Sequence, residues 1–148
     1  MKLDKVYNEV VKERLKDNGR VFMGYLDEDT IGVTTNGFVM YFIPKKEFLL
    51  DVETLLKNNH TANLEGFKEP KDLKEIFKTN EYRKEKNRQL VKIGNKYFNE
   101  KLLKNFEKYA TFKSTDSPTS QAYIYENDVL VGMVMPVRVK EEENYNEG

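Results

Sequence analysis

The chain has 148 residues, a length that favours one domain over a large multidomain enzyme. Lys and Arg together number 25, as do Asp and Glu, so the net charge is zero and the surface as a whole is not built to attract nucleic acid or an anionic membrane. The absence of cysteine excludes disulfides, thiolate metal sites and a cysteine nucleophile. No signal-peptide or transmembrane pattern occurs, so a soluble cytoplasmic protein without membrane contact is expected.

The first part of the chain has the pattern of a helix followed by a β-meander. Apolar residues between Leu3 and Leu15 recur at helical spacing, with lysines on the opposite face. Asn36-Gly37 is a strong hairpin signal, and the acidic run Asp27-Glu28-Asp29 marks another turn. These turns separate three predicted strands, Arg20–Leu26, Thr30–Thr34 and Phe38–Ile43.

The middle of the chain is predicted to be mainly helical. Apolar spacing predicts a helix over Lys46–Lys57. A shorter helix is predicted over Lys71–Thr79, where three apolar residues fall on one side. The apolar run Leu90–Ile93 is predicted to be a strand.

A second helix-plus-meander pattern begins after Gly94-Asn95. Its predicted helix carries one apolar stripe, formed by Phe98, Leu102, Leu103, Phe106 and Tyr109. Its outer face carries Lys101, Lys104 and Lys108. Three strands are then predicted, over Ala110–Ser114, Ala122–Tyr125 and Val129–Val139. Residues 140–148 form an acidic tail that is expected to be disordered.

The two patterns share letters at a nearly constant spacing. Asp4-Lys5-Val6-Tyr7-Asn8-Glu9 corresponds to Asn95-Lys96-Tyr97-Phe98-Asn99-Glu100, 91 residues further on. The strand Phe38–Pro44 corresponds to Leu130–Pro136 at a spacing of 92 residues. The sequence therefore predicts an α+β fold of two helix-plus-β-meander repeats related by a pseudo-twofold axis. Chance likeness between two segments rich in Lys, Asn and Glu is the alternative.

This interpretation places residues 1–139 in a single domain. Repeat 1 spans residues 1–44 and repeat 2 spans residues 87–139. Between them lies a predicted helical insertion, residues 45–86.

Residues 95–138 carry three short motifs in a recognisable order. They are Asn95-Lys96-Tyr97-Phe98, Asp116-Ser117-Pro118 and Val134-Met135-Pro136-Val137-Arg138. In this order they resemble the end of the bacterial sliding clamp, the DNA polymerase processivity factor. The resemblance covers about 44 of the 148 residues, and a clamp domain is itself a duplicated helix-and-strand unit.

The resemblance implies one clamp-like domain whose helices face double-stranded DNA without reading its sequence. Sliding clamps carry such domains in tandem on one chain, whereas this chain has room for one. A closed ring would therefore need several subunits, which makes a homo-oligomer one expected partner. Replication or host proteins are the other partners that the resemblance implies.

Basic residues are concentrated between residues 83 and 108, where nine cations face three glutamates. Flexible cations neutralise backbone phosphates without reading bases. With two lysines of the first helix they supply the candidate nucleic-acid-binding residues Lys12, Lys16, Arg83, Lys84, Arg88, Lys101, Lys104 and Lys108. The alternative is a solvated surface of a Lys-rich protein. Scattering of the nine cations over several faces would favour a protein-interaction module without DNA.

Two other features have the chemistry of a site. The carboxylates of Asp27-Glu28-Asp29 suit a hard divalent cation, although acidic residues in a turn are usually just solvated. His60 is the only imidazole, and no Ser or Cys accompanies it in a recognisable catalytic motif. No catalytic residue, cofactor site or metal ligand is therefore assigned.

The sequence as a whole favours a non-catalytic, DNA-associated accessory or interaction protein. Its 20 lysines, five arginines and 14 asparagines are compatible with an AT-rich genome such as that of a phage or mobile element. One alternative is an adaptor or inhibitor that uses the same fold to bind proteins without DNA. The other is a small hydrolase or transferase of unrecognised type, with His60 or the acidic turn in its site.

Overall fold

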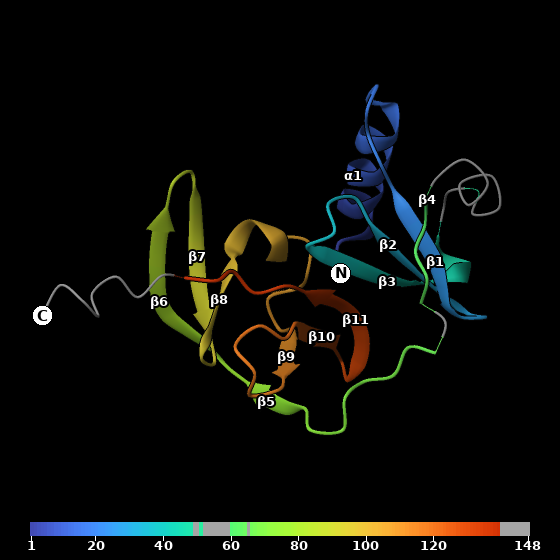
Figure 1. Ribbon diagram of the computed structural model, residues 1–148. Coiled ribbons are helices and arrows are strands. Elements are labelled where there is room, and N and C mark those ends of the chain that lie inside the picture. The colour runs from blue at the N-terminus through green and yellow to red at the C-terminus, as the bar shows by residue number, and fades with distance from the viewer. Residues whose placement is uncertain (49–50, 52–59, 65, 140–148) are drawn as a thin grey trace, which may run out of the picture.

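Two β-sheets and a long helix make up the fold in the computed structural model, which describes residues 1–48, 51, 60–64 and 66–139 (Figure 1). The elements are α1 (Leu3–Leu15), β1 (Phe22–Asp27), β2 (Thr30–Thr34), β3 (Val39–Pro44), η1 (Lys45–Glu47), β4 (His60–Thr61), β5 (Lys74–Ile76), β6 (Lys78–Glu85), β7 (Arg88–Ile93), β8 (Lys96–Asn99), η2 (Glu100–Leu103), β9 (Thr111–Ser114), β10 (Ala122–Glu126) and β11 (Val129–Val134). The larger sheet has the order β4-β1-β2-β3-β11-β10-β9-β5, and the smaller sheet has the order β6-β7-β8. The α+β class is thereby confirmed.

The predicted first helix and first meander are confirmed. α1 has the predicted bounds, and Val6, Tyr7 and Val10 form its buried face. β2 also has the predicted bounds, whereas the ends of β1 and β3 differ by one or two residues. The side chain of Asn36 accepts hydrogen bonds from the two backbone N–H groups that follow Gly37, as expected for a turn at this position.

The predicted helix over Lys71–Thr79 is wrong. Residues 74–76 form β5, in which Ile76 lies opposite Phe112 of β9, and residue 78 already begins β6. Phe77, expected on the buried side of a helix, is 67% exposed. Three apolar residues cannot stabilise a short helix when pairing with a neighbouring strand satisfies the same backbone.

The predicted helix after Gly94-Asn95 is also wrong. Gly94 adopts a φ of +65° and turns the chain tightly, so that β8 returns along β7. A short 3-10 helix, η2, follows, and the Asn99 side chain accepts a hydrogen bond from the N–H group of Lys101 at its start. The Gly-Asn pair therefore acts as a hairpin turn and not as the start of a helix.

The residues predicted to form the apolar stripe and the lysine face of that helix therefore lie on different elements. Phe98 is buried in β8 and Phe106 is buried after η2, whereas Tyr109 is 58% exposed. The three expected outer lysines lie on η2 and on the chain that follows it, so no helix face unites them.

The final strands form the predicted second meander, but its last strand is shorter than expected. β11 ends at Val134, and Val137 forms an isolated bridge with Tyr97 of β8. β11 lies beside β3 in the larger sheet, so the third strand of one meander pairs with the third strand of the other.

The hairpins β2–β3 and β10–β11 pair in the same register. Three pairs in the first hairpin are Ile31 with Ile43, Gly32 with Phe42, and Val33 with Tyr41. Adding 91 to each number gives Ala122 with Val134, Tyr123 with Met133, and Ile124 with Gly132, which are all pairs in the second hairpin. This spacing is the one that separates the two similar segments at residues 4–9 and 95–100.

The main core lies between α1, one face of the larger sheet and the smaller sheet. Val10 of α1 belongs to the same buried cluster as Val33, Tyr41 and Ile124 of the larger sheet and Phe98 of the smaller one. Full burial of one such side chain contributes about 1.5–3 kcal/mol. The cluster therefore holds segments from both halves of the chain together.

The opposite face of the larger sheet is covered by residues 62–64 and 66–70, which we call the strap. A Cβ on Gly32 would lie 2.7 Å from the Leu64 Cδ1, so the strap approaches the sheet where β2 has no side chain. The Phe67 ring lies 5.8 Å from that of Phe42 and 6.1 Å from that of Tyr123, between centroids. Part of the expected helical insertion is thus an extended cover.

Two predictions lie outside the described residues. Most of the helix predicted over Lys46–Lys57 falls there, with η1 at its start inside the described part. The acidic tail, residues 140–148, lies wholly outside it. Within the described residues, no helix has the length and apolar character needed to cross a membrane.

Candidate functional site

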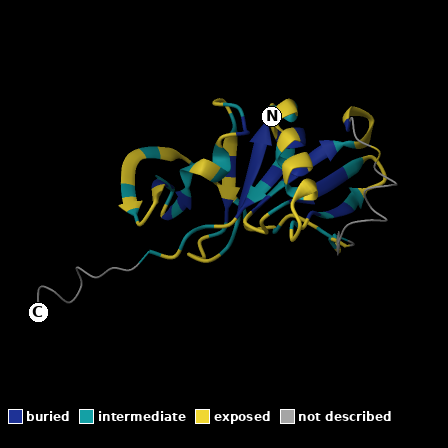
Figure 2. Cartoon of the chain, turned by 90° about the horizontal axis from the view of Figure 1, so that it is seen from above, coloured by how far each residue is buried: buried dark blue, intermediate teal, exposed yellow. Residues whose placement is uncertain are grey.

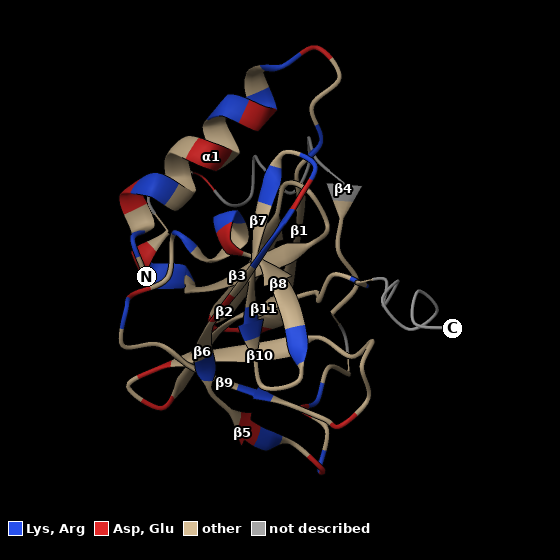
Figure 3. Cartoon of the chain, turned by 90° about the vertical axis from the view of Figure 1, so that its left-hand side faces the viewer, with Lys and Arg blue, Asp and Glu red and all other residues tan. Residues whose placement is uncertain are grey.

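The predicted nucleic-acid-binding residues lie on several elements (Figure 3). Lys12 is on α1 and Lys16 follows its end; Arg83 and Lys84 are on β6, Arg88 is on β7, Lys101 is on η2, and Lys104 and Lys108 follow η2. The basic stretch of residues 83–108 therefore does not form one continuous surface. Its cations divide among the β6–β7 hairpin, the protein interior, and η2 with the chain that follows it.

Lys96 is the interior member of the basic stretch and is only 3% exposed. Its Nζ donates hydrogen bonds to the Ser114 hydroxyl, to the Thr115 carbonyl at 2.9 Å and to the Ser120 hydroxyl at 2.9 Å. Burial lowers the pKa of Lys96, while the charge of nearby Asp116 opposes that change. Lys96 thus anchors the β9–β10 turn and is not available to a phosphate.

A hollow between α1 and the chain after η2 brings two of the predicted cations together. It has a volume of about 490 Å³ and is lined by Lys2, Lys5, Asn8, Glu9, Lys12, Lys104 and Asn105. We call it the α1 hollow. Its α1 residues recur at spacings of three and four, which places them on one side of the helix.

The sequence predicted Lys12 and Lys104 of this hollow but missed Lys2 and Lys5. The spacing of Lys5 and Lys12 on one helix face was the available signal. Lys2 lies before α1, and only folding brings it to Lys104.

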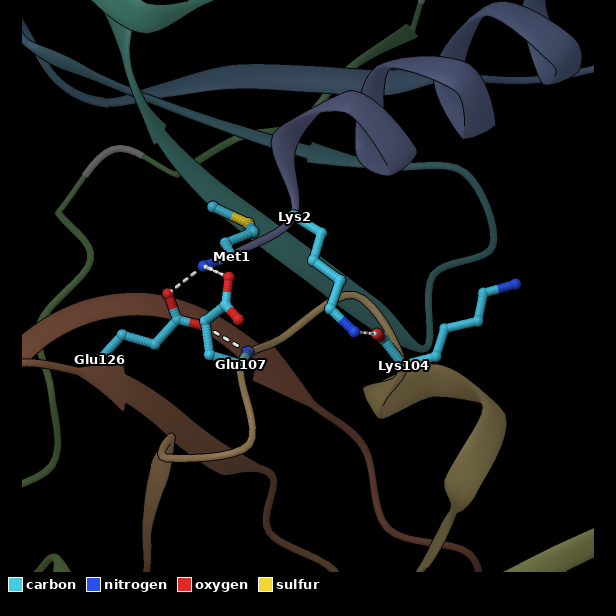
Figure 4. Close-up of polar contacts among 5 residues, drawn as sticks. All are labelled: Met1, Lys2, Lys104, Glu107 and Glu126. Carbon is cyan, nitrogen blue, oxygen red and sulfur yellow. Dashed lines mark hydrogen bonds and ion pairs between the residues drawn. The ribbon is translucent and has the colours of Figure 1, made fainter.

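Contacts between distant segments hold the start of α1 against the chain after η2 (Figure 4). The Lys2 Nζ donates a hydrogen bond of 3.2 Å to the Lys104 carbonyl. The α-amino group of Met1 contacts the carboxylate of Glu126 and lies 3.2 Å from that of Glu107. These contacts fix the distance between the two walls of the α1 hollow.

Glu9 is the only carboxylate among the described residues that line the α1 hollow, and it accepts hydrogen bonds from uncharged donors. The Asn105 Nδ2 donates to it at 3.2 Å and the Thr35 hydroxyl at 3.5 Å. Burial and the charge of Glu9 raise the pKa of Tyr41, whose hydroxyl lies 3.0 Å from the same Nδ2. Glu9 therefore belongs to a hydrogen-bond network in the wall.

The four lysines of the α1 hollow form no ion pair with any residue that the structure describes. Four ammonium groups against one carboxylate leave the lining with a formal excess of three positive charges. Ammonium and amide groups are suitable donors for phosphate oxygens. This arrangement can bind a polyanion.

A second hollow continues from the first. It has a volume of about 440 Å³, shares Lys2 and Lys104 with the α1 hollow, and adds Lys78 and Lys108 to the lining. Glu75, Glu100 and Glu107 also line it. We call it the second hollow; its four lysines face three glutamates, so its lining has a formal excess of only one positive charge.

A third, smaller hollow is apolar. It has a volume of about 110 Å³ and is lined by Thr34, Gly37, Phe38, Met40, Gln121, Met133, Val134 and Met135. Phe38 is 61% exposed and Met135 is 39% exposed. This apolar hollow lies where the β2–β3 turn meets the end of β11, a junction that only the sheet order creates.

The other two sequence features lie elsewhere. The Asp27-Glu28-Asp29 run forms the β1–β2 turn, where the Asp27 carboxylate accepts a hydrogen bond of 2.8 Å from the Asp29 N–H group. His60 lies in β4, opposite Phe22 of β1. Among the side chains that the structure describes, no three His, Asp or Glu residues are grouped as metal ligands would be.

Comparison with protein-family models, with curated proteins and with solved structures found no match. Any function of the α1 hollow must therefore be argued from its own chemistry.

Proposed function

We propose that this protein is a non-catalytic, DNA-associated accessory protein that holds duplex DNA at the α1 hollow without reading its sequence. The observation that carries the proposal is the set of four lysines, Lys2, Lys5, Lys12 and Lys104, in one hollow and without ion pairs among the described residues. Flexible ammonium groups bind phosphates as point charges, which gives affinity without base recognition.

The order and register of the larger sheet support a clamp-like domain as the scaffold of this function. The two hairpins of equal register meet through β3 and β11, as a pseudo-twofold axis between these strands would require. In this proposal α1 lies on the DNA side of the sheet and the strap lies on the opposite side. Encirclement of DNA would need several subunits, so a ring would be a homo-oligomer.

A salt-dependent titration tests the DNA proposal. The variant Lys12→Gln/Lys104→Gln removes two cations of the α1 hollow, and Lys68→Gln/Lys71→Gln removes two exposed cations on or next to the strap. Fluorescence anisotropy with a labelled duplex of arbitrary sequence measures affinity at several salt concentrations. The slope of log affinity against log salt should fall by about 0.9 for each lost phosphate contact, or about 1.8 for the hollow variant, and remain unchanged for the control.

Two outcomes would contradict the proposal. One is the absence of duplex binding by the wild-type chain at low salt. The other is an equal loss in the hollow variant and the control, because a general effect of charge would then replace a site. Gel filtration with and without the duplex separates a monomer from a closed assembly.

The apolar hollow favours a second function, in which the domain binds the apolar side chain of a partner protein. The exposed Phe38 and Met135 are its support, together with the division of the basic stretch among several places. An environment-sensitive apolar dye should bind the wild-type chain and lose most of its signal with Phe38→Ser. An unchanged dye signal would contradict this second function, and salt-dependent DNA binding by the same chain would then support the DNA function only.

A further inference from the structure

The hairpin of β6 and β7 extends beyond the strand that supports it. β8 pairs with residues 90–93 of β7, while Lys84 pairs with Gln89 and Glu85 pairs with Arg88 further out (Figure 1). We call residues 84–89 the arm tip. Figure 2 shows this hairpin as a mostly exposed projection at one end of the molecule. The arm tip is therefore not covered by β8 and can meet a partner.

The arm tip is basic, and its one carboxylate is shared. Glu85 lies between two arginines, at 3.6 Å from Arg83 Nε and 3.5 Å from an Arg88 terminal nitrogen. Lys84 and Lys86 are exposed and form no ion pair with the residues that the structure describes. Two ammonium groups at the end of a narrow ribbon thus remain available.

Lys86 occupies an unusual backbone conformation at the turn. Its φ is +55°, a left-handed value that glycine and asparagine adopt far more readily than lysine. Neighbouring Asn87 does not share this positive φ. A lysine kept at the strained position places its charge at the outermost point of the ribbon, and strained positions often mark functional sites.

The arm tip adjoins the second hollow. The Gln89 Nε2 donates a hydrogen bond of 3.2 Å to Glu100, which itself lines the second hollow. The second hollow shares Lys2 and Lys104 with the α1 hollow. The arm tip and the α1 hollow therefore both adjoin the second hollow.

We infer that the arm tip is a second contact to the same DNA duplex, in which Lys84 near the end of β6 and Lys86 in the turn bind backbone phosphates. A two-stranded β-ribbon fits the major groove of B-form DNA, and exposed cations at its tip then lie near the phosphate backbone. This inference rests on the proposed function but uses residues outside the α1 hollow. The partner is assigned as DNA because a two-stranded ribbon is narrow enough to enter the major groove and because Lys84 and Lys86 form no ion pair among the described residues.

The variant Lys84→Gln/Lys86→Asn tests the arm directly. Asparagine tolerates the left-handed φ at position 86, so the turn is retained while the charge is lost. The salt slope should fall by about 1.8, and affinity for an arbitrary duplex should decrease severalfold at intermediate salt. Lys68→Gln/Lys71→Gln serves again as the control of equal charge, and circular dichroism verifies that the fold is unchanged.

A fluorescent reporter tests whether DNA contacts the protein at the arm tip. The chain has no tryptophan, and Tyr82 on β6 is 49% exposed, so Tyr82→Trp introduces a single reporter beside the arm tip. Duplex DNA should change its emission, and the change should disappear when Lys84→Gln/Lys86→Asn is added.

Failure of the arm can be told apart from failure of the DNA function. An unchanged salt slope in the arm variant, with a reduced slope in Lys12→Gln/Lys104→Gln, would overturn the arm contact and retain the DNA function. No binding by the wild-type chain would overturn both. An arm variant that keeps full DNA affinity would refute this inference even if it weakened an acidic protein partner.

Discussion

Two segments of the chain, residues 3–44 and 95–134, end in hairpins of the same register but begin in different structures. Residues 5–9 form part of α1, whereas residues 96–100, which have similar letters 91 positions later, form β8 and the start of η2. The downstream hairpins nevertheless pair in matching registers. Similar sequence therefore did not dictate similar local structure.

The cause of this difference lies in what precedes the second segment. β7 and the tight turn at Gly94 bring a strand edge alongside residues 96–99, so their backbone groups bond to β7. Pairing also buries Lys96 and Phe98. Intrinsic helix preference is worth less than about 1 kcal/mol per residue, so strand pairing and burial outweigh it here.

The largest test of this contrast compares two positions of the expected apolar stripe. Phe98 is fully buried and Leu102 is partly buried, although a helix would bury both. Phe98→Ala should reduce the free energy of unfolding by about 3–5 kcal/mol. Leu102→Ala should cost clearly less, because a smaller buried group is removed. Urea unfolding measures both, and equal losses would contradict the strand at residues 96–99.

Two glycines at turns provide the next test. Gly37 has a φ of +79° with open space where a Cβ would lie, whereas Gly94 has a φ of +65° and its Cβ would lie 2.9 Å from Ile76 Cβ. Gly37→Ala should cost about 1–2 kcal/mol through the left-handed backbone alone. Gly94→Ala adds a steric conflict and should cost a further 1–3 kcal/mol or so. Thermal unfolding of both variants measures which loses more stability. A smaller loss for Gly94→Ala than for Gly37→Ala would mean that β5 moves away from the added Cβ at little cost.

The smallest test uses the corresponding lysines of the two halves. Lys5→Met removes an exposed side chain and should leave the unfolding free energy nearly unchanged. Lys96→Met removes the donor from the buried Ser114 hydroxyl and from the partly buried acceptors on Thr115 and Ser120. It should cost about 1–3 kcal/mol. Equal small effects would mean that the interior site of Lys96 contributes nothing.

The pH dependence of the Lys96 variant gives a second measurement. Because burial lowers the pKa of Lys96 below the value of about 10.4 expected in the unfolded chain, the folded state releases this proton first as pH rises. The unfolded state then holds more protons, so the wild-type unfolding free energy should rise with pH relative to Lys96→Met, up to about pH 10.4. A difference that is independent of pH would contradict the lowered pKa.

Two of the four lysines of the α1 hollow were predicted as individual residues. Lys12 was predicted from the polar face of α1, and Lys104 from the basic stretch. Their meeting in one hollow was not foreseeable, because it depends on contacts such as that between Lys2 and the Lys104 carbonyl, 102 residues apart. Charge alone likewise did not separate buried Lys96 from exposed Lys84.

The sequence by itself determined α1, the turn at Asn36-Gly37 and the strands of both meanders, because apolar periodicity and turn chemistry act over a few neighbouring residues. Only the tertiary structure decided that residues 74–76 and 96–99 are strands, since strand pairing draws its stability from partners distant in the chain. Tertiary packing also decided which lysines share a hollow and which one is buried. Local sequence specifies the preferences of a segment, and the neighbours that folding brings to it decide which preference prevails.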